Sequence, residues 1–176
     1  MVVEKDGEII INTHWCFEES TEVTREDGST VAVKDLNEGE RILSQKDGKK
    51  FYDKVIDATV IEGKVPAHKF EFANGKHVTA TSPHLMMVWK GNEMEMVAAR
   101  EVQVHDLMCF EDGKFTKVTK VVDVVLDRKV SVNTLSGTLY GNGVLTTGMC
   151  DNRPLNTPTS AKLIQMAYME SHKAFA

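Results

Sequence analysis

A single cysteine and a short histidine-containing motif provide residue types that nucleophilic chemistry uses. Cys16 follows Trp15 near the start of the chain, and the sequence TSPH at residues 81–84 follows a strand-like run. A lone cysteine is usually a small buried hydrophobe, and a lone histidine is usually solvated. A thiolate, however, is a strong nucleophile, and imidazole exchanges protons near neutral pH. The two features together favour one shared site over two unrelated residues.

These residues must be positioned by a chain that is mostly β-structure. Short runs of β-branched or alternating apolar residues are separated by Asp-Gly and Asn-Gly pairs, which are typical of tight turns. The Asp-Gly pairs begin at residues 6, 27, 47 and 112, and the Asn-Gly pairs begin at residues 74 and 142. Only the C-terminal tail, after TPTS at residues 157–160, has apolar residues at helical spacing. We therefore predict an all-β fold with one C-terminal helix.

The chain contains an internal repeat. VAVKDLNEGERIL at residues 31–43 matches VAAREVQVHDLMC at residues 97–109 after a shift of 66 positions. The same shift aligns residues 54–60 with 120–126, and a shorter shift relates residues 69–81 to 130–142. This ordered series predicts two β subdomains of about 60 residues each, related by a pseudo-twofold axis and sharing one core.

Composition and charge exclude several classes of protein. The 176 residues fit one domain with a tail, and 41% hydrophobic against 27% charged residues is a globular balance. A net charge of -5 argues against a nucleic-acid groove. The chain shows neither a membrane-spanning run nor a secretory signal, and its three cysteines fit neither a disulfide framework nor a zinc ribbon. We expect a monomer without cofactor, metal or transmembrane segment.

The sequence resembles the Hint superfamily, which comprises the hedgehog and intein autoprocessing domains. The resemblance is carried by the segment CFEESTEVTREDGSTVAVKDLNEGERIL, by FEFANGKHVTATSPHLMMVW and by TLYGNGVLTTG, and it covers about residues 16 to 150. It implies the pseudo-twofold Hint fold of two intertwined β subdomains. It also divides the chain into an upstream segment (1–15), a Hint domain (16–152) and a tail that we predict to be helical (153–176).

The resemblance implies a role for each residue of the motifs. Cys16 is the nucleophile that attacks the carbonyl of Trp15, His84 protonates the departing amide nitrogen, and Thr81 holds the scissile peptide. The product of this N-to-S acyl shift is an internal thioester, which water, a thiol or another acceptor then cleaves. The substrate is the chain's own upstream polypeptide, so the reaction is a single turnover in cis.

The closing segment departs from that of splicing members of the family. Splicing requires a histidine, then a terminal asparagine, then a cysteine, serine or threonine, and those positions hold Thr147, Gly148 and Met149. We therefore predict N-terminal cleavage without splicing, closer to the hedgehog or bacterial intein-like type. Hedgehog domains carry a cysteine near this place, and Cys150 is a shifted candidate for an auxiliary thiol or a peripheral residue without a role.

The acid that activates a sterol hydroxyl in hedgehog domains has no clear counterpart. Val60 occupies its position, and Asp53 and Asp57 lie nearby on the same predicted strand. We interpret both aspartates as surface charges, supported by Asp123 as the repeat partner of Asp57, and keep Asp57 as an auxiliary candidate. The missing acid argues against sterol transfer, and the acceptors that we consider are water, a thiol, a sterol or an amine.

The remaining expectations concern a second cysteine, a second histidine and the alternative functions. We expect Cys109 to be a buried core thiol and His105 a turn or surface residue. A degenerate Hint domain that serves as a binding or structural module is the alternative function, and a cysteine hydrolase acting on external substrates is a third. The sequence does not indicate a compartment, although a hedgehog-like role would place the protein in the secretory pathway or outside the cell.

Overall fold

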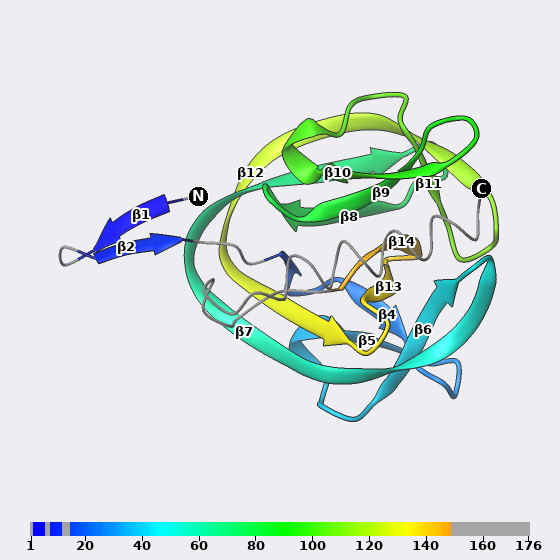
Figure 1. The fold of residues 1–176 in the computed structure, drawn as a ribbon, viewed down its shortest axis with the longest axis horizontal. Helices are drawn as coiled ribbons and strands as arrows, with labels where there is room; N and C mark the ends of the chain where they lie inside the picture. The colour runs from blue at the N-terminus through cyan, green and yellow to red at the C-terminus, as the bar shows by residue number, and fades with distance from the viewer. Residues whose placement is uncertain (1, 6–7, 12–14, 149–176) are drawn as a thin grey trace.

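Two long, curved strands form the frame of the molecule. The computed structural model describes residues 2–5, 8–11 and 15–148, so the predicted C-terminal helix and Cys150 lie outside the described residues. Strands β7 (Lys49–Phe72) and β12 (Phe115–Thr134) pair antiparallel along most of their length and bend into an open ring, with the β1–β2 hairpin outside it (Figure 1). The alternation of β-branched and polar residues in both segments suits such half-buried strands.

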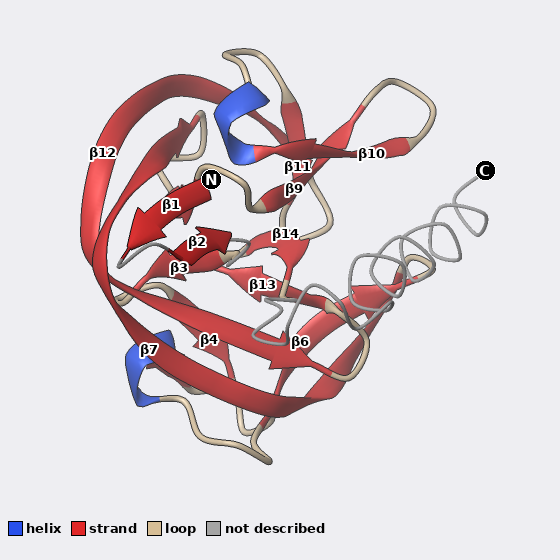
Figure 2. Cartoon of the chain, turned by 60° about the vertical axis from the view of Figure 1, so that its left-hand side comes forward, coloured by secondary structure: helices blue, strands red, loops and turns tan. Residues whose placement is uncertain are grey.

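The shorter strands complete the sheets. The principal sheet runs in the order β13-β14-β9-β11-β12-β3-β8-β7-β6, with β10 paired to β9, while β4 pairs with β5 and β1 pairs with β2 (Figure 2). Their bounds are β1 Val2–Lys5, β2 Glu8–Ile11, β3 Cys16–Glu18, β4 Glu22–Thr24, β5 Thr30–Ala32, β6 Arg41–Lys46, β8 His77–Thr81, β9 Leu85–Trp89, β10 Met94–Ala98, β11 Leu107–Cys109, β13 Thr138–Gly141 and β14 Val144–Thr147. The predicted all-β architecture is confirmed.

The internal repeat is visible in matching turns. The 3-10 helices η1 (Val33–Asp35) and η2 (Ala99–Glu101) occupy equivalent positions in the two halves. Each is followed by a turn residue in the left-handed region, Gly39 with φ +88° and His105 with φ +80°. His105 is therefore an exposed turn residue, as predicted.

The second block of the repeat aligns differently from the sequence match. Gly39 N–H donates to the carbonyl of Val55, whereas His105 N–H donates to the carbonyl of Val118. The counterpart of Val55 is thus Val118 and not Val121, because the hairpin that follows β11 is shorter than the one that follows β6. Asp123 is consequently not the structural partner of Asp57.

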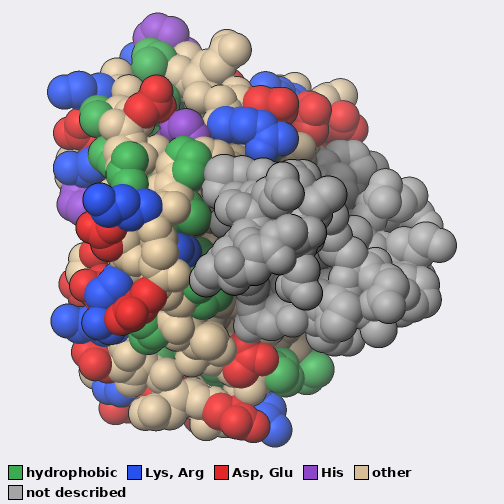
Figure 3. All heavy atoms as spheres, turned by 90° about the vertical axis from the view of Figure 1, so that its left-hand side faces the viewer, with side chains coloured by type: hydrophobic (Ala, Val, Ile, Leu, Met, Phe, Trp, Pro, Cys, Tyr) green, Lys and Arg blue, Asp and Glu red, His purple; other side chains and the backbone are tan. Residues whose placement is uncertain are grey.

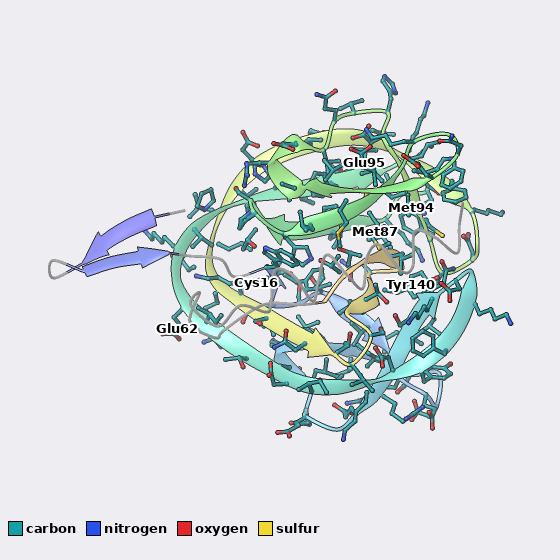
Figure 4. The ribbon with its side chains drawn as sticks, in the orientation of Figure 1. Cys16, Glu62, Met87, Met94, Glu95 and Tyr140 are labelled. Carbon is teal, nitrogen blue, oxygen red and sulfur yellow. The ribbon has the colours of Figure 1, made fainter. Side chains whose placement is uncertain are left out.

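One apolar core lies inside the ring. It joins side chains from both halves, including Phe17, Phe70 and Val130, and Phe72 meets Phe110 edge to face with ring centroids 4.9 Å apart. A smaller cluster contains Met87, Met94, Cys109, Tyr140 and Leu145, three of which are labelled in Figure 4. Cys109 is the buried core thiol that the sequence predicts, and burial raises the pKa of its thiol.

The interpretation of Asp53 and Asp57 as surface charges is wrong for Asp53. Asp53 is only 4% exposed, because its carboxylate accepts hydrogen bonds from the backbone N–H and hydroxyl of Ser136 and from the N–H of Lys54. Asp57 is half-buried and accepts two hydrogen bonds from the amide of Asn133, at 3.0 and 3.2 Å. Both carboxylates therefore help to fix the end of β12.

The outer surface carries charges of both signs. On the face shown in Figure 3, basic and acidic side chains are interspersed over the described part of the molecule. Ion pairs such as Arg41 with Glu26 and Arg128 with Glu19 contribute to this mixture. No helix within the described residues is long and apolar enough to cross a membrane.

Candidate functional site

Cys16 occupies the centre of the ring. It is the first residue of β3, a strand that lies between β12 and β8 and pairs with both (Figure 4). Cys16 is opposite Ser131 of β12, and Phe17 is opposite Ala80 of β8. Both residues at the start of β3 are fully buried, so the peptide between Trp15 and Cys16 enters the interior of the domain.

Thr81 contacts the peptide nitrogen of Cys16. Thr81 ends β8 and is buried, and its Oγ1 accepts a hydrogen bond of 3.0 Å from the Cys16 N–H. That nitrogen is the one that would leave if the Trp15–Cys16 bond were broken. The structure therefore brings Thr81 to the place where the motif predicted a hydroxyl.

His84 lies beside the same peptide. The turn after β8 is closed by a hydrogen bond of 2.9 Å from the His84 N–H to the Thr81 carbonyl, which places the imidazole over β3. The ring is fully buried and packs against Phe17, with ring centroids 4.5 Å apart, and lies 6.4 Å from the ring of Trp15. The structure thus brings Cys16, Thr81 and His84 together.

The closing strand fixes the tautomer of His84. Nε2 lies 2.9 Å from the carbonyl oxygen of Thr147 in β14, and a carbonyl can only accept, so Nε2 carries the proton. Nδ1 is then the basic nitrogen, and it has no hydrogen-bond partner in the described part of the chain. A neutral His84 therefore holds an available lone pair in the buried site.

Burial keeps His84 uncharged. Removal of the ring from water lowers the pKa of His84 to about 4, although its contacts with the backbone of Thr147 and Cys16 act in the opposite direction. At neutral pH the imidazole is therefore uncharged, and burial makes it a weaker base than a histidine in water. Once protonated, it would be a strong acid in an apolar setting, and would readily pass the proton on.

The residues of the closing strand are used in packing and hydrogen bonding. The Thr147 hydroxyl donates to the carbonyl of Leu85 at 2.8 Å, and the Gly148 N–H donates to the carbonyl of Gly137 at 2.9 Å. The sequence motif did not predict that the Thr147 carbonyl would hold the histidine. Only the pairing of β14 with β9 brings these residues together.

The auxiliary candidates are not joined to this centre. Asp57 bonds Asn133, which lies two residues beyond Ser131 on β12, and Cys150 lies outside the described residues. Among the residues that the structure describes, no group of three His, Cys, Asp or Glu side chains could hold a metal ion.

A second polar network lies next to the motif. His68 Nδ1 is 2.8 Å from Asp123 Oδ1, and His68 Nε2 is 2.8 Å from the hydroxyl of Ser82. This Ser-His-Asp order resembles a hydrolase triad. In such enzymes the backbone N–H of the residue after the serine often helps to form the oxyanion hole, but here that residue is Pro83, which has no N–H. Ser82 N–H already bonds the Pro66 carbonyl. The network therefore serves to anchor the loop that carries Thr81 and His84.

Comparisons with known proteins agree with this architecture. The sequence model described as the Hint module matches residues 5–149. The chain is similar in fold to the gp41-1 intein, with a TM-score of 0.64 and 16% identity over 76% of this chain and 98% of that chain. It is also similar to a bacterial intein-like domain from Clostridium thermocellum, with a TM-score of 0.66 and 18% identity over 75% of this chain and 97% of that chain.

One curated relative shows a more local likeness. The chain is 33% identical over 96 residues to the DNA polymerase II large subunit of Methanoculleus marisnigri. The match covers 50% of this chain and 7% of that protein, so the chain spans a small fraction of the relative's length.

Proposed function

This chain belongs to the Hint family, whose modules process themselves, and on that premise we propose that it performs an N-to-S acyl shift at the Trp15–Cys16 bond. The observation that carries the proposal is the hydrogen bond of 3.0 Å from the Cys16 N–H to Thr81 Oγ1, with His84 beside it. Leaving nitrogen, hydroxyl and imidazole then lie at one end of β3, beside the sulfur of the same residue.

The steps follow from the tautomer of His84. Nδ1 takes the thiol proton of Cys16, and the sulfur forms a bond to the carbonyl carbon of Trp15. The bond from that carbon to the Cys16 nitrogen then breaks, and the imidazolium returns the proton to the nitrogen. The products are a thioester on Cys16 and a free amine on the same residue, so atoms and charge balance.

The lowered pKa of His84 suits the second half of this cycle. It keeps the ring neutral before the reaction, and it makes the buried imidazolium a strong acid that readily protonates the leaving nitrogen. Thr81 keeps the amide nitrogen within reach while the bond breaks. Thr81 and Cys16 are thus proposed as catalytic residues together with His84.

The fate of the thioester is proposed from the closing strand. The Thr147 hydroxyl is engaged with Leu85, and Gly148 has no side chain, so neither supplies the chemistry of a splicing end. We assign resolution of the thioester to water, a thiol or another small nucleophile. The products are the segment upstream of Cys16 and the Hint domain. The tail after residue 152 stays joined to the Hint domain.

Intact mass tests this proposal. The purified chain is incubated near neutral pH with dithiothreitol or hydroxylamine, beside Cys16→Ala and His84→Ala. We expect loss of residues 1–15 from the wild type but not from these two variants, since one lacks the nucleophile and removal of a proton-transfer group typically slows such steps by about 10²- to 10⁴-fold. His77→Ala is the matched control, because His77 is exposed at the other end of β8.

The alternatives predict other masses. An unchanged wild type under every nucleophile would contradict self-cleavage and favour a Hint fold kept for binding. Cleavage that persists in Cys16→Ala would contradict the role of this cysteine.

A further inference from the structure

Ser131 lies directly opposite Cys16. The two residues face each other across the antiparallel pair β12–β3, and both are fully buried. Directly opposed residues in such a pair project to the same side, with Cβ atoms about 4.5–5.5 Å apart. The hydroxyl of Ser131 is therefore on the same face of the sheet as the thiol of Cys16.

The hydroxyl of Ser131 has no hydrogen-bond partner among the described residues. Within residues 15–148, three buried polar side-chain atoms have no partner: Thr21 Oγ1, His84 Nδ1 and Ser131 Oγ. A buried polar group without a partner destabilises the folded state and needs a physical explanation. Ser131 is itself fully buried within a strand, a setting that suits a valine on packing grounds.

The charged groups around this face already have partners. Lys129, on β12, donates to the carbonyl of Gly63, and Glu18, on β3, accepts from the hydroxyl and N–H of Ser20. Asp57, on β7, accepts from the amide of Asn133, and the neutral ring of His84 donates to Thr147. Ser131 is thus a neutral hydrogen-bond donor beside the thiol. Its hydroxyl is not bonded to any of these groups.

We propose that Ser131 is a further catalytic residue, whose hydroxyl donates a hydrogen bond to the Cys16 sulfur when the thiol loses its proton. Staggered rotamers about χ1 let the Oγ turn toward or away from the opposed side chain. A thiolate formed out of contact with water needs such a donor, because burial disfavours the charged form. The hydroxyl remains unpaired while the thiol is neutral and is used only when charge develops.

This inference rests on the proposed acyl shift for its consequence, but it can be tested apart from it. In chain labelled with ¹³C-cysteine, the Cβ shift of Cys16, identified by its loss in Cys16→Ala, follows ionisation of the thiol with pH. The titration is made in a His84→Ala background, where the N-to-S acyl shift is blocked. Ser131→Thr and Ser131→Val give side chains of nearly equal shape with and without the hydroxyl.

The expected results separate the two variants. Ser131→Val raises the midpoint of Cys16 ionisation by about one pH unit or more, whereas Ser131→Thr leaves it near the parent value. With His84 present, Ser131→Val slows thiol-induced cleavage by about 10- to 100-fold, and Ser131→Thr retains most of the rate. Thr21→Val is the control, since it removes another unpartnered buried hydroxyl, from a side chain that packs beside Gly141.

Two outcomes would overturn the inference. One is an equal midpoint in Ser131→Val and Ser131→Thr, and the other is a shift in Thr21→Val as large as that in Ser131→Val. A wild-type chain that never releases its upstream segment would instead contradict the proposed function, while the titration would still report whether Ser131 contacts the thiolate.

Discussion

The burial of His84 makes the stability of the domain depend on pH. Its pKa is lowered from 6.5 to about 4 in the folded chain, mainly because the ring is removed from water. Between these values the unfolded chain binds more protons than the folded one, so acidification favours unfolding. The contribution of neutral His84 to the free energy of unfolding is fully present above about pH 6.5. It decreases by up to about 3 kcal/mol as the pH falls toward 4.

Urea unfolding from pH 4.5 to 7.5, followed by tryptophan fluorescence, measures this dependence. We expect His84→Gln to lose part of the slope of the free energy of unfolding between pH 4.5 and 6.5. His105→Asn is the control, because His105 is exposed and asparagine tolerates its positive φ. Equal slopes in the wild type and His84→Gln would contradict the burial of a neutral imidazole.

Sequence motifs predicted some of these residues and missed others for a physical reason. Cys16, Thr81 and His84 stand in short recognisable strings, and the structure brings them together. Ser131 depends on the register between β3 and β12, which are far apart in the chain. Asp53 was wrongly placed on the surface because its burial depends on Ser136, a loop residue of the other half.

The turns after η1 and η2 show what the repeat requires of each element. Gly39 and His105 both have φ near +80 to +90°, a region that glycine enters without steric penalty and other residues do not. We expect His105→Gly to raise the free energy of unfolding by about 0.5 kcal/mol and Gly39→Ala to lower it by about 1 kcal/mol. Thermal unfolding would show opposite shifts of about 1–4 °C.

Shifts of the same sign in His105→Gly and Gly39→Ala would contradict the equivalence of these turns.

The sequence predicted the first block of the repeat correctly, because a turn of fixed geometry constrains its residues. It misaligned the second block, since β-branched runs resemble one another and the hairpin β11–β12 is shorter than β6–β7.

Close packing at the end of β14 joins strands that are distant in the sequence. A Cβ added at Gly148 would overlap Leu139 Cδ2 and lie 3.2 Å from the carbonyl oxygen of Val132. Leu139 is fully buried and cannot turn away freely. A side chain at position 148 therefore has to displace the junction between β12, β13 and β14.

This packing bears on whether a splicing end could be restored. We expect Gly148→Asn to lower the free energy of unfolding by about 1–3 kcal/mol, as overpacking of a core does. In a Leu139→Val background the same change should cost less, because the shorter side chain leaves room for the new Cβ. Urea unfolding of the four chains gives the coupling energy. Additive effects would contradict the overlap, whereas strong coupling would show that the interior itself disfavours an asparagine at this end.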